Sequence, residues 1–162
     1  MRRDLLWRRG LRLAVSCTIC VLALGLAPLR ARAELGGVYE GIGHDQEALH
    51  ATLAQEEHTG YTLYTLTLPG GIEVREYYSQ HSGIFAVSWT GKNRRPDMRQ
   101  ILGSYFERFS RTPEQQHRPV NQVFRRAEPD FVLESRGEMR RFSGRAFLPA
   151  YVPQEVSLDE IR

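Results

Sequence analysis

The clearest periodicity in the sequence is a stripe of apolar residues at helical spacing near the middle of the chain. Its members recur at i, i+3, i+4, i+7, i+8 and i+11, and they are Met98, Ile101, Leu102, Tyr105, Phe106 and Phe109. This period predicts one amphipathic α-helix over 98–109. Asp97 is placed to cap its first turn, and Gln100 completes a capping box. Because the stripe is rich in aromatic residues, we expect the helix to pack across a sheet and to be the main stability element.

Three segments before this helix have the composition of β-strands. Threonine, tyrosine and apolar residues dominate Tyr61 to Leu68, Ile72 to Ser79 and Ile84 to Thr90. Pro69-Gly70-Gly71 separates the first two, and Gln80 to Gly83 separates the last two. Connections this short predict antiparallel neighbours.

Alternation assigns the side chains of these strands to faces. In the second strand one face carries Glu73, Arg75 and Tyr77. Glu76 points to the other face, so it does not form a carboxylate pair of the glycosidase type with Glu73. In the third strand one face is expected to carry Phe85, Val87 and Trp89.

The chain after the helix is less regular. Residues 110–128 show no period and contain two prolines, which predicts a long loop. Phe131 to Glu134 and Met139 to Leu148 are predicted strands, joined by a turn at Arg136-Gly137. In the last strand the outward residues are expected to be Arg141, Ser143 and Arg145. Gly144 lies between them, where a glycine admits a close neighbour.

Together these elements predict an α+β fold. We expect a mostly antiparallel sheet of about five strands, in the order β-β-β-α-β-β, with one amphipathic helix packed on a face. The core domain spans 61–149, with the long loop at 110–128. An N-terminal segment, 34–60, contains a possible short helix from Asp45 to Glu57. The tail, 150–162, either covers an edge or frays.

The first 33 residues have the order of a cleavable signal peptide. Five arginines precede an apolar run from Leu13 to Leu26, and Ala31-Arg32-Ala33 supplies small residues before the cleavage point. Cleavage between Ala33 and Glu34 is therefore predicted. The apolar run is shorter than the roughly 20 residues that span a bilayer, so an uncleaved anchor is the weaker alternative. We expect an exported protein, periplasmic or extracellular, that meets the membrane only through the signal before cleavage.

Removing the signal changes the charge of the chain. The sequence has 22 Lys and Arg and 19 Asp and Glu, of which seven basic residues and one acidic residue fall in 1–33. The remaining 15 basic and 18 acidic residues give a net charge of −3. A nucleic-acid partner therefore loses its electrostatic support. Both cysteines, Cys17 and Cys20, lie in the signal, so the exported part must be stable without disulfides.

No motif in the chain specifies catalysis, a metal or a cofactor. The five histidines lack the i, i+4 spacing of a zinc-binding pair. There is no Gly-x-Ser-x-Gly elbow and no cysteine after residue 33. We therefore predict no catalytic residue, no metal ligand and no cofactor, and a hydrolase is the third-ranked function.

The outward polar residues are the best candidates for a binding site. Arg75, Tyr77, Arg141 and Arg145 are expected on a face that the helix leaves uncovered, where arginines suit an anion or an acidic partner. We expect Arg75 and Arg145 to lie close enough to engage one acidic group. The alternative is a solvated, salt-bridged sheet face, which antiparallel sheets commonly have.

Several motifs resemble one known family. They read V-R-E-Y at 74–77, P-D-x-R-x-x-L-G-x-Y-F at 96–106 and F-S-G-R-A-F-L-P at 142–149. In this order they resemble an uncharacterised family of bacterial exported proteins, a domain of unknown function, over 34–162. The resemblance implies a bacterial, envelope-side protein and supplies no activity or ligand. Packing alone does not explain Arg75, Gly103 and Arg145 in these motifs.

These observations favour a non-enzymatic domain that binds an envelope protein or an acidic ligand. The second hypothesis is a small-ligand-binding periplasmic protein, with a pocket between the aromatic helix and the sheet. A flat, uncovered sheet edge would favour the first hypothesis.

Overall fold

The computed structural model describes residues 35–37, 40–94, 96–110 and 123–162. The chain divides into two compact units, residues 1–30 and 31–162, and all described residues belong to the second. The predicted signal peptide and its cleavage site, Ala33–Glu34, lie outside the described residues, as does most of the predicted 110–128 loop.

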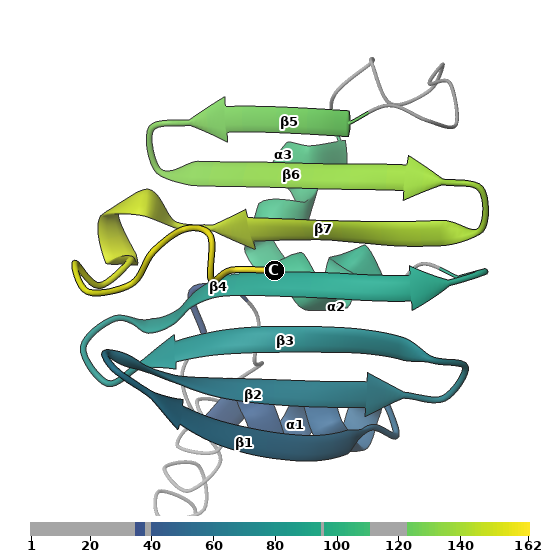
Figure 1. The fold of residues 1–162 in the computed structure, drawn as a ribbon, viewed down its shortest axis with the longest axis horizontal. Helices are drawn as coiled ribbons and strands as arrows, with labels where there is room; N and C mark the ends of the chain where they lie inside the picture. The colour runs from purple at the N-terminus through teal and green to yellow at the C-terminus, as the bar shows by residue number, and fades with distance from the viewer. Residues whose placement is uncertain (1–34, 38–39, 95, 111–122) are drawn as a thin grey trace, which may run out of the picture. The chain divides into compact units, whose positions relative to one another are not determined.

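The second unit is built on one antiparallel sheet of seven strands (Figure 1). The strands are β1 (Thr52–His58), β2 (Tyr61–Leu68), β3 (Ile72–Ser79), β4 (Gly83–Lys92), β5 (Val123–Glu128), β6 (Phe131–Glu138) and β7 (Arg141–Phe147). Their spatial order is β1-β2-β3-β4-β7-β6-β5. Two meanders, β1 to β4 and β5 to β7, are therefore joined by the pairing of β4 with β7.

The predicted fold of about five strands with one packed helix is wrong. The sequence Thr-Leu-Ala-Gln-Glu-Glu-His forms β1 rather than the end of a helix, and Val123–Glu128 forms β5 rather than loop. Both are edge strands. Most side chains of β1 are exposed, as are Val123, Arg125 and Ala127 of β5, so their sequences lack the apolar alternation that identifies a buried strand. The turn after β6 falls at Met139 and Arg140, beyond the predicted Arg136-Gly137.

The helical segments are also shorter than predicted. The chain forms α1 (Glu40–Ala48), α2 (Met98–Leu102), the 3₁₀ turn η1 (Gly103–Tyr105) and α3 (Phe106–Ser110). Gly103 has a φ of +51° and ends α2, which breaks the predicted continuous helix. The Asp97 cap is confirmed, because its carboxylate accepts the Arg99 N–H at 2.9 Å. The Gln100 side chain does not complete a capping box and instead donates to Asp45 at 3.5 Å.

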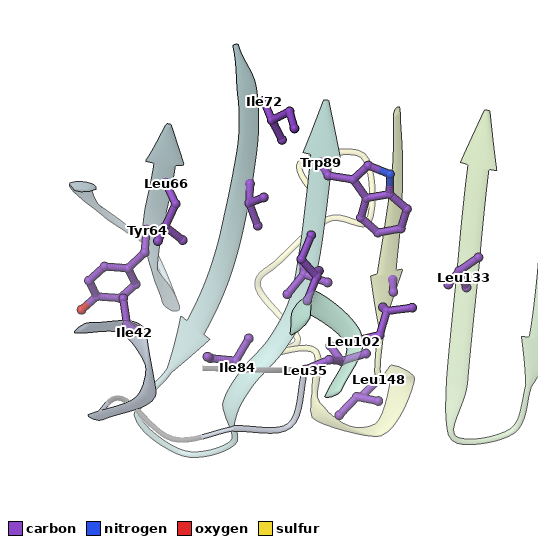
Figure 2. Close-up of a cluster of buried hydrophobic side chains, with 14 of the residues drawn as sticks. Leu35, Ile42, Tyr64, Leu66, Ile72, Ile84, Trp89, Leu102, Leu133 and Leu148 are labelled. Atoms are coloured by element: carbon purple, nitrogen blue, oxygen red, sulfur yellow. The ribbon is translucent and has the colours of Figure 1, made fainter. Parts of the chain in front are cut away.

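Each face of the sheet has its own buried cluster. The helix-side cluster joins strand residues such as Leu66, Trp89 and Leu133 to Ile42 of α1 and Leu102 of α2 (Figure 2). The tail-side cluster lies on the opposite face, under the tail, which we define as residues 149–162. Its buried members are Tyr61, Tyr77, Phe85, Ala86, Val132, Phe147, Val156 and Ile161. The tail begins with the 3₁₀ turn η3 (Pro149–Tyr151).

A β-bulge divides the residues of β4 between the two clusters. Tyr77 pairs with Ala86 and Tyr78 pairs with Ile84, which leaves Phe85 as the extra residue. As a result Phe85 joins the tail-side cluster, whereas Val87 and Trp89 join the helix-side cluster. The predicted common face for these three residues is therefore wrong.

Gly144 of β7 gives Trp89 the space to pack on the sheet. A Cβ at this position would contact the Trp89 ring and would lie 2.6 Å from the carbonyl oxygen of Glu134. The glycine therefore admits a close neighbour, as the sequence predicted. Because the Glu134 carbonyl belongs to the paired strand β6, it is not free to move away from a side chain.

We expect Gly144→Ala to lower the free energy of unfolding by roughly 1–3 kcal/mol through overpacking. Urea unfolding monitored by the fluorescence of Trp89 measures this loss. Gly43→Ala in α1 is the matched control, since a Cβ there meets nothing within 4 Å and alanine favours helix. Equal stabilities of the two variants would contradict the packing role of Gly144.

Candidate functional site

Two of the predicted arginines lie in one row across the tail-covered face. The register pairs Arg75 of β3 with Ser88 of β4, and Ser88 with Arg145 of β7. Glu134 of β6 follows in the same row. Two strand spacings of about 4.8 Å therefore separate the backbones of the two arginines. Tyr77 lies next to this row, and its hydroxyl is 3.4 Å from the Oγ of buried Ser88.

These side chains hold the main chain of the tail. Arg75 donates to the main-chain oxygen of Arg162 at 2.7 Å. Arg145 donates to the main-chain oxygens of Leu158 and Ile161, the second at 3.1 Å. The Tyr77 hydroxyl accepts the Arg162 N–H at 3.0 Å. In Figure 1 the end of the chain accordingly lies over β4.

Contacts near the tail shift the pKa values of two ionisable groups, Glu134 and Tyr61. Partial burial acts to raise the pKa of Glu134, but hydrogen bonds from Arg145 at 2.8 Å and Arg125 at 3.0 Å outweigh it and lower that pKa. Burial and a hydrogen bond to Glu160 raise the pKa of Tyr61 to about 12, so its hydroxyl remains protonated at neutral pH. Glu134 is thus an ionised partner of Arg145 in the folded protein.

Beyond the tail, the same face forms a groove with excess positive charge. Two adjoining hollows of about 400 and 380 Å³ share Thr90, Arg136 and Ser143. The first hollow also contains Lys92 and Arg141, and the second reaches the tail at Ile161 and Arg162. We call this surface the basic groove. Its basic side chains are Lys92, Arg136, Arg141, Arg145 and Arg162, against the acidic Glu134 and Glu138.

Lys92 and Arg141 face each other directly in the β4–β7 register. Within the described part of the chain, neither forms an ion pair. Arg136 lies 3.7 Å from Glu138, and both side chains are more than half exposed. The strands thus bring two cations together at one end of the groove, and Glu138 lies opposite Arg141 in the β6–β7 register.

The four predicted binding residues therefore divide into two groups. Arg75, Tyr77 and Arg145 come together beneath the tail, whereas exposed Arg141 lies at the far end of the groove. The sequence did not single out Lys92 or Arg136. Nothing in the local pattern identifies Lys92, because its position opposite Arg141, 49 residues later in the chain, depends on the pairing of β4 with β7.

The described residues offer little support for a metal centre or a membrane span. Across 35–37, 40–94, 96–110 and 123–162, no three His, Cys, Asp or Glu side chains are grouped so that they could hold a metal ion. Among the described helices, none is both long and apolar enough to cross a membrane.

The fold and this site define a small antiparallel β-sheet domain in which the chain's own helices and tail pack on opposite faces. The chain belongs to a family described as a protein of unknown function (DUF2844), whose model matches residues 31–161. This match confirms the expected domain of unknown function. No curated protein and no solved structure matches the chain.

Proposed function

We propose that this protein is an exported bacterial envelope domain that binds an acidic ligand or partner protein through the basic groove, without catalysing a reaction. The observation that carries this proposal is the direct opposition of Lys92 and Arg141, neither of which forms an ion pair among the described residues, although Glu138 lies opposite Arg141 on β6. Like charges opposite each other on neighbouring strands destabilise a sheet by roughly 0.2–1 kcal/mol. A bound anion would remove this repulsion.

The groove also has the geometry to recognise an acidic group. Arginine side chains form bidentate hydrogen bonds with carboxylates and phosphates. Thr90 and Ser143 add hydroxyl groups on the floor between Arg136 and the Lys92–Arg141 pair. The solvated, salt-bridged face considered as an alternative describes Arg125, Arg145 and Glu134, whereas Lys92 and Arg141 form no salt bridge among the described residues.

Two observations support the export part of the proposal. The family match begins at residue 31, at the end of the predicted signal peptide. The compact unit that contains the sheet also begins at residue 31. A domain that begins at this point is what cleavage of a signal peptide after Ala33 would release.

The other two hypotheses rank lower. None of the hydrogen bonds among the described residues joins a histidine ring to a serine hydroxyl. The hydrolase hypothesis therefore lacks a serine with an adjacent base that could activate it as a nucleophile. In the described residues, the space between α2 and the sheet holds the buried side chains of the helix-side cluster. A small-ligand site is better placed at the end of the sheet, where a separate cleft occurs.

We expect the double variant Lys92→Ala/Arg141→Ala to bind an acidic probe at least tenfold more weakly than the wild type. The probe is poly-L-glutamate, titrated calorimetrically into the purified protein at 50 and 300 mM salt. Because both cations are exposed, the difference should shrink as salt screens the attraction. A pull-down from the envelope fraction with the same variants then identifies the natural partner.

Arg99→Ala is the matched control, since this arginine is exposed and belongs to α2. Equal binding of the double variant and the wild type at low salt would refute the basic groove as the binding surface. Arg99→Ala removes one charge and the double variant removes two, so a loss of binding free energy in Arg99→Ala half as large as in the double variant would show that only net charge is sensed.

A further inference from the structure

Two segments that are distant in the sequence form one surface at an end of the sheet. They are residues 90–94, where β4 ends, and residues 136–141, where β6 ends and the chain turns into β7. The β4–β7 pairing brings them together, and the Asn93 N–H donates to the main-chain oxygen of Arg140 at 2.7 Å. In Figure 1 β4 and β6 both end at the right of the sheet, where β7 begins. We call this surface the basic end.

The backbone of both turns is closely packed. Asn93 has a φ of +66° and Arg140 has a φ of +63°, so each turn contains one residue in the left-handed region. A Cβ at Gly91 would lie 2.5 Å from the main-chain oxygen of Arg94, which shows that the chain folds back tightly after β4. The two turns therefore present their side chains from one connected piece of backbone.

The basic end differs in charge from the rest of the domain. Its two segments contain one acidic residue, Glu138, and five basic residues, Lys92, Arg94, Arg136, Arg140 and Arg141. The other residues after Ala33 include ten basic and 17 acidic residues. Excess positive charge is thus confined to this end, and such a field orients a domain with that end towards an anionic surface.

Glu138 cannot neutralise these cations by itself. It lies 3.7 Å from Arg136, and it is opposite Arg141 in the β6–β7 register. All five basic residues are exposed. The surface therefore keeps a net positive charge with the Glu138 carboxylate ionised.

An exposed methionine lies at the tip of this surface. Met139 is 84% exposed in the β6–β7 turn, and Val123, opposite Arg136 on β5, is 59% exposed. A single exposed apolar side chain is ordinary on a soluble protein. An apolar side chain at the tip of a turn, among several cations, has the composition of segments that bind anionic membranes. In those segments the cations contact head-group phosphates and the apolar group enters the edge of the acyl region.

We propose that the basic end docks on an anionic phospholipid surface, with Met139 entering the boundary between head groups and acyl chains. The docking rests on the function proposed above, since it identifies lipid head groups as the acidic ligand that Lys92 and Arg141 contact. A purely acidic segment of a partner protein would satisfy the cations but would leave Met139 in water. This contact is in addition to the membrane contact that the sequence predicted through the signal peptide.

The test is co-sedimentation of the exported protein, after loss of residues 1–33, with vesicles of phosphatidylglycerol and phosphatidylcholine in equal parts. Vesicles of phosphatidylcholine alone are the comparison. We expect at least tenfold tighter binding to the anionic vesicles, and the difference should shrink as salt screens the attraction. Equal binding to the two compositions, or no binding to either, would overturn the proposal.

Variants test the two parts of the surface separately. Met139→Ser should weaken binding to the anionic vesicles about fivefold, because the apolar side chain no longer leaves water. Arg94→Gln/Arg140→Gln changes two arginines that do not line the basic groove, and it should weaken binding by about fivefold per charge. Tyr151→Ser is the matched control and should bind as the wild type does. Tyr151 is 51% exposed at the opposite end of the sheet, where its main-chain oxygen accepts a hydrogen bond from Ser82 at 2.9 Å. Wild-type affinity in Met139→Ser would overturn the proposal.

Titration of poly-L-glutamate separates failure of the docking from failure of the proposed function. Met139→Ser keeps every charge, so it should bind poly-L-glutamate as tightly as the wild type. Binding of poly-L-glutamate without binding of anionic vesicles would overturn the docking and leave an acidic partner protein as the ligand of the groove. Loss of both would overturn the docking and the proposed function together.

Discussion

Replacing Phe131 with alanine is expected to lower the free energy of unfolding by about 3–5 kcal/mol. The ring is completely buried in the helix-side cluster and stacks on Tyr105, with centroids 5.0 Å apart. Alanine would leave a cavity between β6 and η1 that the paired strands cannot close. Urea unfolding monitored by Trp89 fluorescence measures the loss.

Phe106→Ala tests whether the helical stripe or the strands contribute more to stability. The sequence predicted Phe106 in the main stability element, but its ring is only half-buried and lies under the Arg99 guanidinium at 4.5 Å. We therefore expect a loss of less than about 2 kcal/mol, because less apolar surface leaves water. A loss in Phe106→Ala equal to that in Phe131→Ala would contradict this assignment.

Glu76→Gln is expected to stabilise the protein at neutral pH, because a glutamine side chain stays neutral in both the folded and the unfolded protein. The Glu76 side chain is 2% exposed, and its Oε2 has no hydrogen-bond partner in the part of the chain that the structure describes. Burial, reinforced by the charge of Asp45, raises the pKa of Glu76 well above 4.5. The folded protein therefore binds a proton that the unfolded chain releases more readily.

The sign of the pH dependence follows from this shift. The stability associated with protonated Glu76 is fully present below the unfolded pKa, and it is lost as the pH rises towards and through the raised folded pKa. The advantage of Glu76→Gln over the wild type should thus be small at pH 4 and increase with pH. Glu73→Gln, on the same strand but partly exposed and paired with Arg75, is the control. A constant difference between Glu76→Gln and wild type from pH 4 to 8 would exclude this linkage.

The tail has a direct bearing on the proposed binding sites. It occupies the middle of its sheet face, where Arg75, Tyr77 and Arg145 hold its main-chain groups. The basic groove opens beside it and is partly lined by the tail residues Ile161 and Arg162. The groove therefore depends on a docked tail.

Local sequence patterns predicted those features that depend on near neighbours. The strands Tyr61–Leu68 and Ile72–Ser79 form over the predicted residues, and the Asp97 cap is made. The outward direction of Arg75 and Arg145 also follows from the two-residue period of a strand. A cap or an alternating strand is specified within a few positions, so the local sequence determines it, whereas the turn predicted at Arg136-Gly137 falls at Met139 and Arg140 because β6 pairs with β7 beyond it.

The sequence did not reveal interactions between distant segments. The pairing of β4 with β7 decides that Lys92 faces Arg141, and the bulge at Phe85 depends on how β4 fits β3. The polar edge strands β1 and β5 are recognisable only beside β2 and β6, which supply their hydrogen bonds. The tail docks because Val156 and Ile161 leave water against Tyr77 and Phe85, a gain of apolar burial that exists only once the sheet has formed. Tertiary structure therefore decided which charged residues meet. Strand pairing and burial bring together residues that are far apart in the chain, and no local sequence pattern relates such residues to each other.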